Sequence, residues 1–390
     1  MISFQEAYDI VLHASGLNGT ERVELADAAG RILAEPVVAD MDMPPFDKSA
    51  VDGFACLRSD ISEPLKVIEV VAAGKKPLKT IGKGQCSQIM TGAIVPEPAD
   101  TVLMVEHTEW IDSEHIRFTG EKTANNICYQ AEDVARNQVV LEKGTLLRPQ
   151  EIAVLATFGY ARPWVFKKPL VGVISTGDEL VEPGIKPDIS QIRNSNGLQT
   201  MAQVRMAGAY GKYFGIANDN ELSLAVKIGE ALTASDIVIL TGGVSMGEFD
   251  FVPYVLKSLG VEIKFKSIAV QPGRPTLFGV KGEKYLFGLP GNPVSSFIQF
   301  ELLVKPLIYK MMGYDFRPVS MRIPMGETYS RKKTTRRTVV MVDIREGMIY
   351  PVEYHGSAHI NSLTQAKGFI WLEVGTTSLL KGELTDVRQF

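Results

Sequence analysis

Cysteine, long apolar runs and a secretory leader are scarce or missing in this 390-residue sequence. The three cysteines, Cys56, Cys86 and Cys128, are odd in number and form no CxxC pair. This argues against a disulfide framework and a structural zinc site, and suits a reducing cytosol. No apolar run approaches the roughly 20 residues that span a bilayer, and residues 1–13 lack the basic start and apolar core of a signal peptide. We therefore expect a cytoplasmic protein without membrane contact.

An excess of positive charge is also missing. The chain has 41 Lys and Arg against 45 Asp and Glu, which gives a net charge of -4. A protein that wraps a duplex needs a large basic excess, so nucleic acid is not favoured as a partner. Histidine chemistry is equally unsupported, because Gly356 separates His355 from His359 where a zinc-protease motif needs a helix. A Ser/His/Asp triad is not supported either, because the five histidines lie outside the predicted α/β domain.

What is present is an ordinary globular composition, with 45% apolar and 22% charged residues, and a length that predicts two to four domains. Helical spacing at both ends of the first 168 residues encloses a turn-rich stretch with apolar alternation, which predicts a β-rich insertion. Beyond residue 314 alternation returns without a long helix. We predict an elongated linking domain (1–45 with 138–168), an inserted β-rich domain (46–137), an α/β domain (169–314) and a small C-terminal β domain (315–390).

The α/β domain has the clearest pattern. Its short apolar runs do not alternate, as expected of strands that are covered on both faces. Each run leads into a glycine-containing loop that is followed by a helical pattern. Strands that alternate with helices predict a central parallel sheet, with its ligand crevice at the carboxyl ends of the strands. The expected strands are 170–175, 236–240 and 285–288, and the expected helices are 195–207, 251–259 and 293–312.

The first loop at this edge, residues 175–180 (STGDEL), carries two adjacent carboxylates, Asp178 and Glu179. Hard oxygen ligands suit Mg²⁺, which usually takes one or two carboxylates together with substrate phosphates and water. The alternative is that Asp178 caps a turn while Glu179 is simply solvated.

The second loop, residues 240–250 (LTGGVSMGEFD), combines Gly242, Gly243 and Gly247 with Ser245 and two acids, Glu248 and Asp250. Such glycines let backbone N–H groups converge on an anion, and the acids could complete a metal site or act as a base. The loop is neither a Walker A sequence nor a GxGxxG fingerprint.

Two further loops complete the pattern. In residues 289–296 (LPGNPVSS), Pro293 suits a first helical turn and Asn292 its N-cap, so this loop is also an excellent capping sequence. In residues 270–275 (VQPGRP), two prolines and a glycine present the Arg274 guanidinium, a planar fork suited to an oxyanion. The basic run 331–337 (RKKTTRR) is most often a solvated edge, although one of its arginines could bind an anion.

Taken together, these loops resemble the molybdopterin molybdenumtransferase family, also called MoeA and represented in animals by the C-terminal domain of gephyrin. The similar stretches occur in family order over nearly the whole chain. They are FDKSAVDGFA (46–55), IMTGAIVP (89–96), AEDV (131–134), STGDELV (175–181), TGGVSMGEFDF (241–251), QPGRP (271–275), LPGNPVSSF (289–297) and HGSAHINSL (355–363).

The resemblance implies an elongated four-domain subunit that forms a homodimer, with the active cleft between the α/β domain of one subunit and the β-rich module of the other. It implies Mg²⁺-dependent insertion of molybdate into adenylylated molybdopterin, with release of AMP and formation of the molybdenum cofactor. A transient contact with the adenylyltransferase that supplies the substrate belongs to the same expectation.

The resemblance also assigns roles to residues of this chain. Metal ligation falls to Asp178, Glu179 and Asp250, and the catalytic acids are Asp250, Glu179, Asp52, Asp133 and Asp219, with Asp250 or Glu179 as the base. Substrate and nucleotide contacts are Ser175, Thr176, Gly177, Gly242, Gly243, Ser245, Thr91, Pro290, Gly291 and Asn292. The molybdate cradle is Arg274, Arg336 or Arg337, and Ser357 or Ser362.

Two alternatives remain open on the same fold: a non-catalytic scaffold that binds partners, and a nucleotide pyrophosphatase. The clustered acids argue against a scaffold, which has no need to keep like charges together. Arg274 stands where the family frequently has lysine, which bears on the preference for molybdate or tungstate. Asn194 stands where aspartate is typical, which bears on metal or nucleotide contacts nearby.

Overall fold

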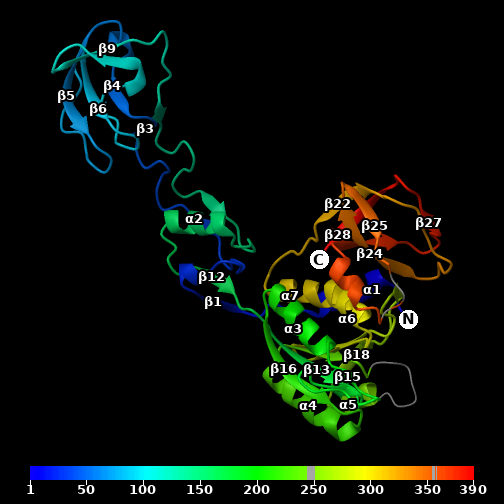
Figure 1. The fold of residues 1–390 in the computed structure, drawn as a ribbon. Helices are drawn as coiled ribbons and strands as arrows, with labels where there is room; N and C mark the ends of the chain where they lie inside the picture. The colour runs from blue at the N-terminus through cyan, green and yellow to red at the C-terminus, as the bar shows by residue number, and fades with distance from the viewer. Residues whose placement is uncertain (244–250, 354–355, 357) are drawn as a thin grey trace.

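The computed structural model describes residues 1–243, 251–353, 356 and 358–390 of the chain. The molecule is elongated: one β module stands at the far end of a narrow stem, and the α/β and C-terminal parts lie together at the other end (Figure 1). Each of the three globular parts is built on a six-stranded sheet. Within the described ranges, no helix combines the length and the apolar character that crossing a membrane requires.

The α/β part is organised by a mixed sheet in the order β16-β13-β17-β21-β20-β18. The first four strands are parallel; β20 runs antiparallel to β21, and the edge strand β18 runs antiparallel to β20. The three apolar runs of the sequence form β13, β17 and β21, so the predicted central parallel sheet is confirmed. The strands are β13 (Leu170–Thr176), β16 (Tyr210–Ala217), β17 (Ile237–Thr241), β18 (Glu262–Phe265), β20 (Leu277–Lys281) and β21 (Lys284–Leu289).

Helices cover both faces of this sheet, which explains why its strands are apolar on both sides. On one face α3 and the α6–α7 helix bury Val204, Ile298 and Leu302 against it; on the other, α4 and α5 bury Ile228 and Leu256. The helices are α3 (Asn196–Met206), α4 (Glu221–Ala234), α5 (Val252–Ser258), α6 (Pro293–Gln299) and α7 (Lys305–Met311).

The long helix expected over 293–312 is present but contains a π segment, Phe300–Val304, between α6 and α7. Pro306 follows this segment, and it has no N–H to donate to the carbonyl of Leu302 one turn earlier. A local widening of the turn at this point accommodates the proline without ending the helix.

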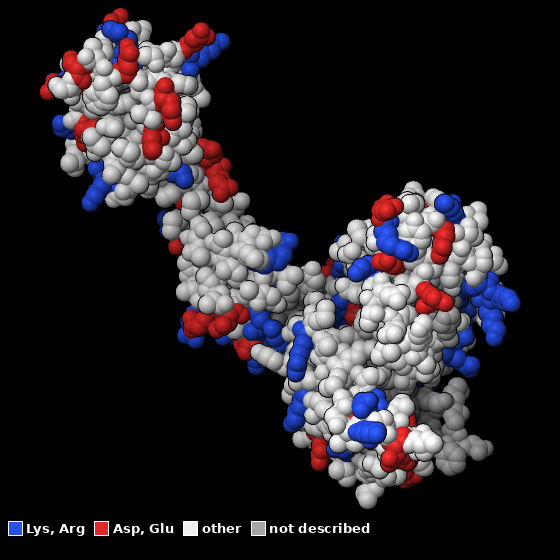
Figure 2. Space-filling model, in the orientation of Figure 1, with Lys and Arg blue, Asp and Glu red and all other residues white. Residues whose placement is uncertain are grey.

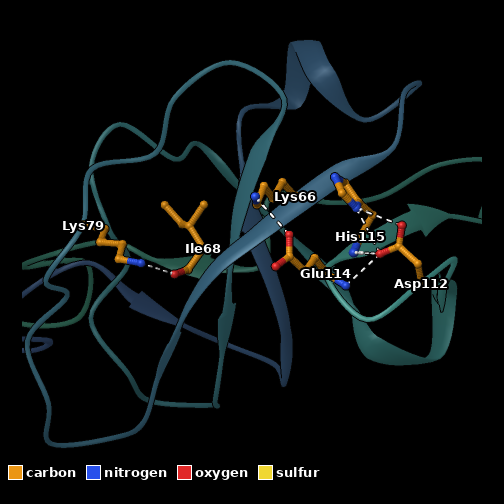
Figure 3. Close-up of polar contacts among 6 residues, drawn as sticks. All are labelled: Lys66, Ile68, Lys79, Asp112, Glu114 and His115. Atoms are coloured by element: carbon orange, nitrogen blue, oxygen red, sulfur yellow. Dashed lines mark hydrogen bonds and ion pairs between the residues drawn. The ribbon is translucent and has the colours of Figure 1, made fainter.

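The distal β module contains the sheet β7-β4-β6-β5-β9-β8. Its surface is held by polar contacts that Figure 3 shows: Lys66 Nζ lies 3.0 Å from Glu114 Oε2, and Asp112 Oδ1 accepts the backbone N–H of His115 at 2.8 Å. Across the sheet, Lys79 Nζ donates to the carbonyl of Ile68 at 2.6 Å. The strands are β4 (Gly53–Cys56), β5 (Leu65–Val71), β6 (Gln85–Ile89), β7 (Thr101–Met104), β8 (Thr108–Trp110) and β9 (His115–Phe118).

The stem consists of short antiparallel pairs and one helix, packed around Leu33, Leu155 and Val165. Its elements pair segments from before and after the inserted module, as β2 with β11 and β1 with β12. They are β1 (Thr20–Arg22), β2 (Val37–Val38), β11 (Val139–Leu141), α2 (Pro149–Thr157) and β12 (Trp164–Phe166). The antiparallel pair β3 (Lys48–Ser49) and β10 (Ile127–Cys128) lies at the distal module, and Ile127 packs in the core of that module.

Helix α1 (Phe4–Ala14) lies outside the stem, although it precedes the stem in the chain. Its Ala7 and Val11 are buried in the core of the α/β part, and the ring of Phe4 lies 5.2 Å from that of Trp371 in the C-terminal part. The apolar face of this amphipathic helix is thus buried where the α/β and C-terminal parts meet. The predicted assignment of residues 1–45 and 138–168 to one linking domain stays a prediction.

The C-terminal part is a sheet in the order β19-β24-β26-β28-β22, with β25 paired to β24. Its edge strand β19 comes from the α/β part, so the sheet ties residues 270–271 to β24. The helix α8 (Asn361–Gln365) is its only described helix. The strands are β19 (Val270–Gln271), β22 (Ser320–Pro324), β24 (Arg337–Arg345), β25 (Met348–Pro351), β26 (Gly368–Leu372) and β28 (Leu384–Gln389).

Candidate functional site

A pocket of about 400 Å³ lies at the carboxyl edge of β13, β17 and β21, where the sequence predicts a ligand crevice. Loops far apart in the sequence meet there because the strands that carry them are neighbours in the sheet. The predicted site residues that line this pocket, called here the nucleotide pocket, are Thr176, Glu179, Asp219, Gly242, Gly243, Pro290, Gly291 and Asn292.

The loop after β13 gathers acids. Gly177 adopts φ +148°, and a Cβ there would lie 2.4 Å from Glu179 Oε2, so only glycine lets this carboxylate fold over the turn. Asp178 Oδ1 accepts the backbone N–H of Asp219 at 3.1 Å. Burial, with added repulsion from the carboxylates of Asp178 and Glu179, raises the pKa of Asp219. The three predicted acids Asp178, Glu179 and Asp219 therefore lie close enough for their negative charges to repel one another.

Ser175, predicted to contact the nucleotide, lies beneath the pocket instead. It is fully buried, and its hydroxyl donates to Asn194 Oδ1 at 3.0 Å and accepts from Thr241 Oγ1 at 3.2 Å. Asn194 in turn donates to the hydroxyl of Tyr213 at 2.7 Å. Ser175 is the penultimate residue of the central strand β13, and its side chain points into the packed layer beneath the pocket. It therefore supports the floor of the pocket.

The glycine turn after β17 packs against the end of β13. Gly242 and Gly243 have φ values of +95° and +61°, and a Cβ on Gly242 would lie 2.5 Å from the carbonyl oxygen of Thr176. Thr176 Oγ1 is buried and has no hydrogen-bond partner within the described part of the chain. The predicted residues Ser245 and Asp250, and Glu248 of the same loop, lie outside the described residues.

The third loop forms the opposite wall. Pro293 opens α6 and Asn292 occupies its N-cap position, as the capping sequence predicts. Asn196, at the start of α3, donates from Nδ2 to the carbonyl of Gly291 at 2.6 Å and so holds this loop against the neighbouring helix. The start of α3 lines the pocket with Ser195 and Asn196, so the positive end of an 11-residue helix faces it.

The loop 270–275 is rigidly held beside this pocket. Gln299 Nε2 donates to the carbonyl of Pro272 at 3.0 Å, and Gly273, at φ +106°, has no room for a Cβ because Gln299 lies 2.3 Å from where it would stand. Pro275 lines the nucleotide pocket. The side chain of Arg274 is exposed between these fixed points, as the sequence predicts for an anion-binding fork.

The two candidate arginines of the C-terminal part differ in their surroundings. Arg337 is already engaged: it forms an ion pair with Glu373 at 2.6 Å and lies 4.0 Å above the ring of Trp371. Arg336 donates to Gln271 Oε1 at 3.3 Å and therefore lies next to the loop that carries Arg274. The structure favours Arg336 over Arg337 as the second cation of an oxyanion site.

Of the two serines predicted to contact molybdate, only Ser362 lies within the described residues. Ser362 is buried in α8, and its hydroxyl donates to the carbonyl of His359 at 2.7 Å. That hydroxyl serves the helix start rather than a ligand. Ser357, the other candidate, lies outside the described residues.

The predicted residues of the inserted module lie far from the nucleotide pocket within one chain. Asp52 Oδ1 accepts both the backbone N–H of Thr91 at 2.6 Å and its hydroxyl at 2.8 Å, and these bonds lower the pKa of Asp52. Asp133 is exposed in the loop that returns to the stem. Figure 2 shows this module at the far end of the stem from the α/β part, with an open gap between the module and the C-terminal part. Intramolecular contact does not bring the two sets of acids together.

One wall of the pocket contains none of the predicted site residues. The pair β14 (Leu180–Val181) and β15 (Ile192–Arg193) and the residues after it line the pocket. The signal in the polar run 193–196 was the asparagine that stands where the family has aspartate, and it bears on contacts in this pocket. Among the described residues, no group of three or more His, Cys, Asp or Glu side chains is arranged to hold a metal ion.

Comparison with known proteins agrees with this architecture. Residues 172–310 match a probable molybdopterin binding domain, so the fold and its pocket define a protein of the molybdopterin-binding class. Residues 2–159 match the MoeA N-terminal region (domain I and II), and residues 327–390 match the MoeA C-terminal region (domain IV).

Similar proteins span the whole chain. The molybdopterin molybdenumtransferase of Bacillus subtilis is 36% identical over 401 residues, covering 99% of this chain and 93% of the relative. That of Staphylococcus epidermidis is 37% identical over 381 residues, with coverage of 94% and 90%. The solved molybdopterin biosynthesis MoeA protein of Pyrococcus horikoshii superposes with a TM-score of 0.86 at 29% identity, over 100% of both chains. The chain belongs to the molybdopterin molybdenumtransferase family and is a transferase of molybdenum cofactor biosynthesis, as the resemblance of its loops implies.

Proposed function

We propose that this protein inserts molybdate into adenylylated molybdopterin, with release of AMP and formation of the molybdenum cofactor. The observation that carries the proposal is the meeting of three polar loops in the nucleotide pocket: the acidic turn 176–179, the glycines 242–243 and the start of α6 at 290–293. Acids, glycine turns and helix starts together suit a phosphoanhydride, whose cleavage requires positioning and charge neutralisation more than covalent chemistry.

The residues present fit Mg²⁺. Asp178, Glu179 and Asp219 offer hard oxygen atoms at one edge of the pocket. The pKa of Asp219 is raised by burial first and then by repulsion from Asp178 and Glu179, and a divalent cation would offset that repulsion. Mg²⁺ needs only one or two protein carboxylates when substrate phosphates and water complete its shell. We propose Asp178 and Glu179 as its ligands, with Asp250, outside the described residues, as a third. When bound, the ion would neutralise the charge of the phosphates.

The protein's own groups perform the remaining tasks. The starts of α3 and α6 direct positive ends toward the phosphates. The buried Thr176 hydroxyl is available as a donor, and the Ser175–Asn194–Tyr213 chain fixes the floor beneath it. A water attacks a phosphorus atom of the phosphoanhydride, the P–O–P bridge breaks with AMP as one product, and Glu179, or Asp250, accepts the proton of that water. Arg274 and Arg336 hold the molybdate dianion, because guanidinium forks bind oxyanions as they bind phosphate.

We further propose that the active protein is a cytoplasmic homodimer in which each nucleotide pocket is completed by Asp52, Thr91 and Asp133 of the partner subunit. The support is geometric: within one chain the stem separates the distal module from the α/β part that contains the pocket (Figure 1, Figure 2). A two-fold arrangement would satisfy both pockets at once. Transient contact with the adenylyltransferase that supplies the substrate is part of the same proposal.

The test is incubation of the purified protein with adenylylated molybdopterin, molybdate and Mg²⁺, with AMP release followed by chromatography. We expect AMP and a molybdenum-loaded product, and loss of both when EDTA replaces Mg²⁺. Failure to release AMP from the authentic substrate would reject the proposed reaction. Hydrolysis of ordinary dinucleotides at a comparable rate would indicate a pyrophosphatase, and dimerisation without either activity would indicate a scaffold.

A further inference from the structure

A second pocket of about 400 Å³ lies between the α/β and C-terminal parts, and none of the predicted site residues lines it. Its size is that of a small-molecule site. The walls are largely apolar and come from both parts: Val294 at the start of α6, Val340 and Met341 on β24, and Val352 after β25. We call it the apolar pocket.

The apolar pocket is the immediate neighbour of the nucleotide pocket. The loop 270–275 separates them, with Pro272 on one side and Pro275 on the other. The start of α6 also separates the two pockets, because Val294 lines the apolar pocket and Asn292 lines the nucleotide pocket. A ligand with two ends could therefore occupy both pockets by crossing the loop that presents Arg274.

Among the described residues, no Lys or Arg lines the apolar pocket, and its charged groups are two carboxylates. Glu327 and Glu353 bring carboxylates to its wall, and the ring of Tyr329 adds a flat surface. Gln271 is oriented by its bond from Arg336. Both carboxylates are exposed at the rim of the pocket, where they disfavour a phosphate or another anion as the occupant. They suit a flat ring with a row of N–H donors, since a carboxylate accepts two parallel N–H bonds as it does from a guanidinium.

We propose that the apolar pocket binds the pterin ring of the substrate, with the carboxylate of Glu327 accepting from the 2-amino group and the adjacent ring N–H. The inference rests on the proposed function, which supplies a ligand with a pterin at one end and an adenylate at the other. The adenylate end then lies in the nucleotide pocket, and the part that receives molybdate lies between them, beside Arg274 and Arg336. The faces of the ring pack between Tyr329 and the valines of β24 and α6.

The experiment measures equilibrium binding of neopterin, a fluorescent pterin without adenylate, to the intact protein in the presence and absence of AMP. We expect neopterin and AMP to bind together, because they occupy different pockets. Glu327→Gln places an amide donor against the pterin's donors and should weaken neopterin binding about tenfold or more while AMP binding is unchanged. Glu283→Gln, on the exposed β20–β21 turn, is the matched control and should change neither.

The outcomes are distinct. Absence of neopterin binding, equal binding by Glu327→Gln and the unchanged protein, or displacement of neopterin by AMP would each overturn the assignment of the pocket. None of these measurements needs turnover. If the protein releases AMP normally but neopterin binding ignores Glu327, the pocket assignment fails and the function stands. If neopterin binds as expected but no AMP is released, the function fails.

Discussion

At the scale of single residues, the acids of the nucleotide pocket oppose one another. Asp219 is half-buried beside Asp178 and Glu179, and its pKa is raised by burial first and by these two charges second. A carboxyl whose pKa rises on folding favours the protonated form in the native state. Its contribution to stability is therefore complete below the ordinary value of 3.8 and is lost as the pH rises through the raised pKa.

Asp219→Asn should consequently stabilise the metal-free protein at pH 7.5. The residue is partly exposed and the repulsion is screened, so the expected gain in free energy of unfolding is less than about 1 kcal/mol. Urea denaturation in EDTA at pH 7.5 and at pH 5 measures it, and the gain should shrink toward acid. The exposed Asp188→Asn variant serves as control and should show no gain. A difference that grows toward acid would contradict the assigned direction of the shift.

Two cysteines are opposite each other inside the distal module. Cys56 on β4 pairs in register with Cys86 on β6, both are fully buried, and burial raises the pKa of each to about 12. At pH 8 only about one in ten thousand of such thiols is ionised. Cys128 is only half-buried.

Ellman's reagent at pH 8 should therefore titrate one thiol in the native protein and three in urea. Cys128→Ser should remove the rapid native reaction and leave two thiols that respond only on unfolding. Rapid modification of two or more thiols in the native protein would show that the distal module opens readily, contrary to its packed core.

At the scale of elements, the sequence predicted the strands and loops of the site better than the directions of its side chains. Apolar runs without alternation identify covered strands, and since parallel strands share a carboxyl edge, the loops after β13, β17 and β21 had to meet. The pattern of apolar runs does not determine where a single side chain points. Ser175 was predicted as a nucleotide contact, and it is buried under the pocket. Arg337 was predicted, as the alternative to Arg336, to hold molybdate, and it is paired with Glu373. Such partners come from distant segments.

The loop 270–275 offers the sharpest test of an element. Gly273→Ala must place a Cβ at φ +106° against Gln299, so the loop has to shift, and we expect a loss of about 2 kcal/mol or more in stability. Gly282→Ala, at φ +58° with nothing within 4 Å, should cost only about 1 kcal/mol. Urea unfolding compares the two. Equal costs would mean that the contact with Gln299 does not hold the loop.

At the scale of the whole molecule, the distance between the distal module and the nucleotide pocket is the feature that supports a dimer. The distal module holds Asp52 and Thr91 in a fixed pair, but the stem holds that pair away from the nucleotide pocket of its own chain (Figure 1). A rigid arm of paired strands and a helix is a poor hinge for bending back. Such an arm can instead place the distal module beside the pocket of a neighbouring subunit. The proposed reaction therefore depends on the proposed homodimer, because each pocket needs acids from the partner subunit.

Mixing two inactive variants tests that dependence. Asp52→Ala removes the contribution of the arm, and Glu179→Ala removes that of the pocket, so each homodimer should be inactive. If the pocket is completed by the partner, a mixed dimer contains one doubly defective site and one intact site. Random mixing of equal amounts, with subunit exchange, should then restore about one quarter of the unaltered activity in AMP release. A variant carrying both substitutions, mixed with itself, is the control and should stay inactive. Completion of the pocket within one chain predicts no recovery at all, because every site would then keep its own defect.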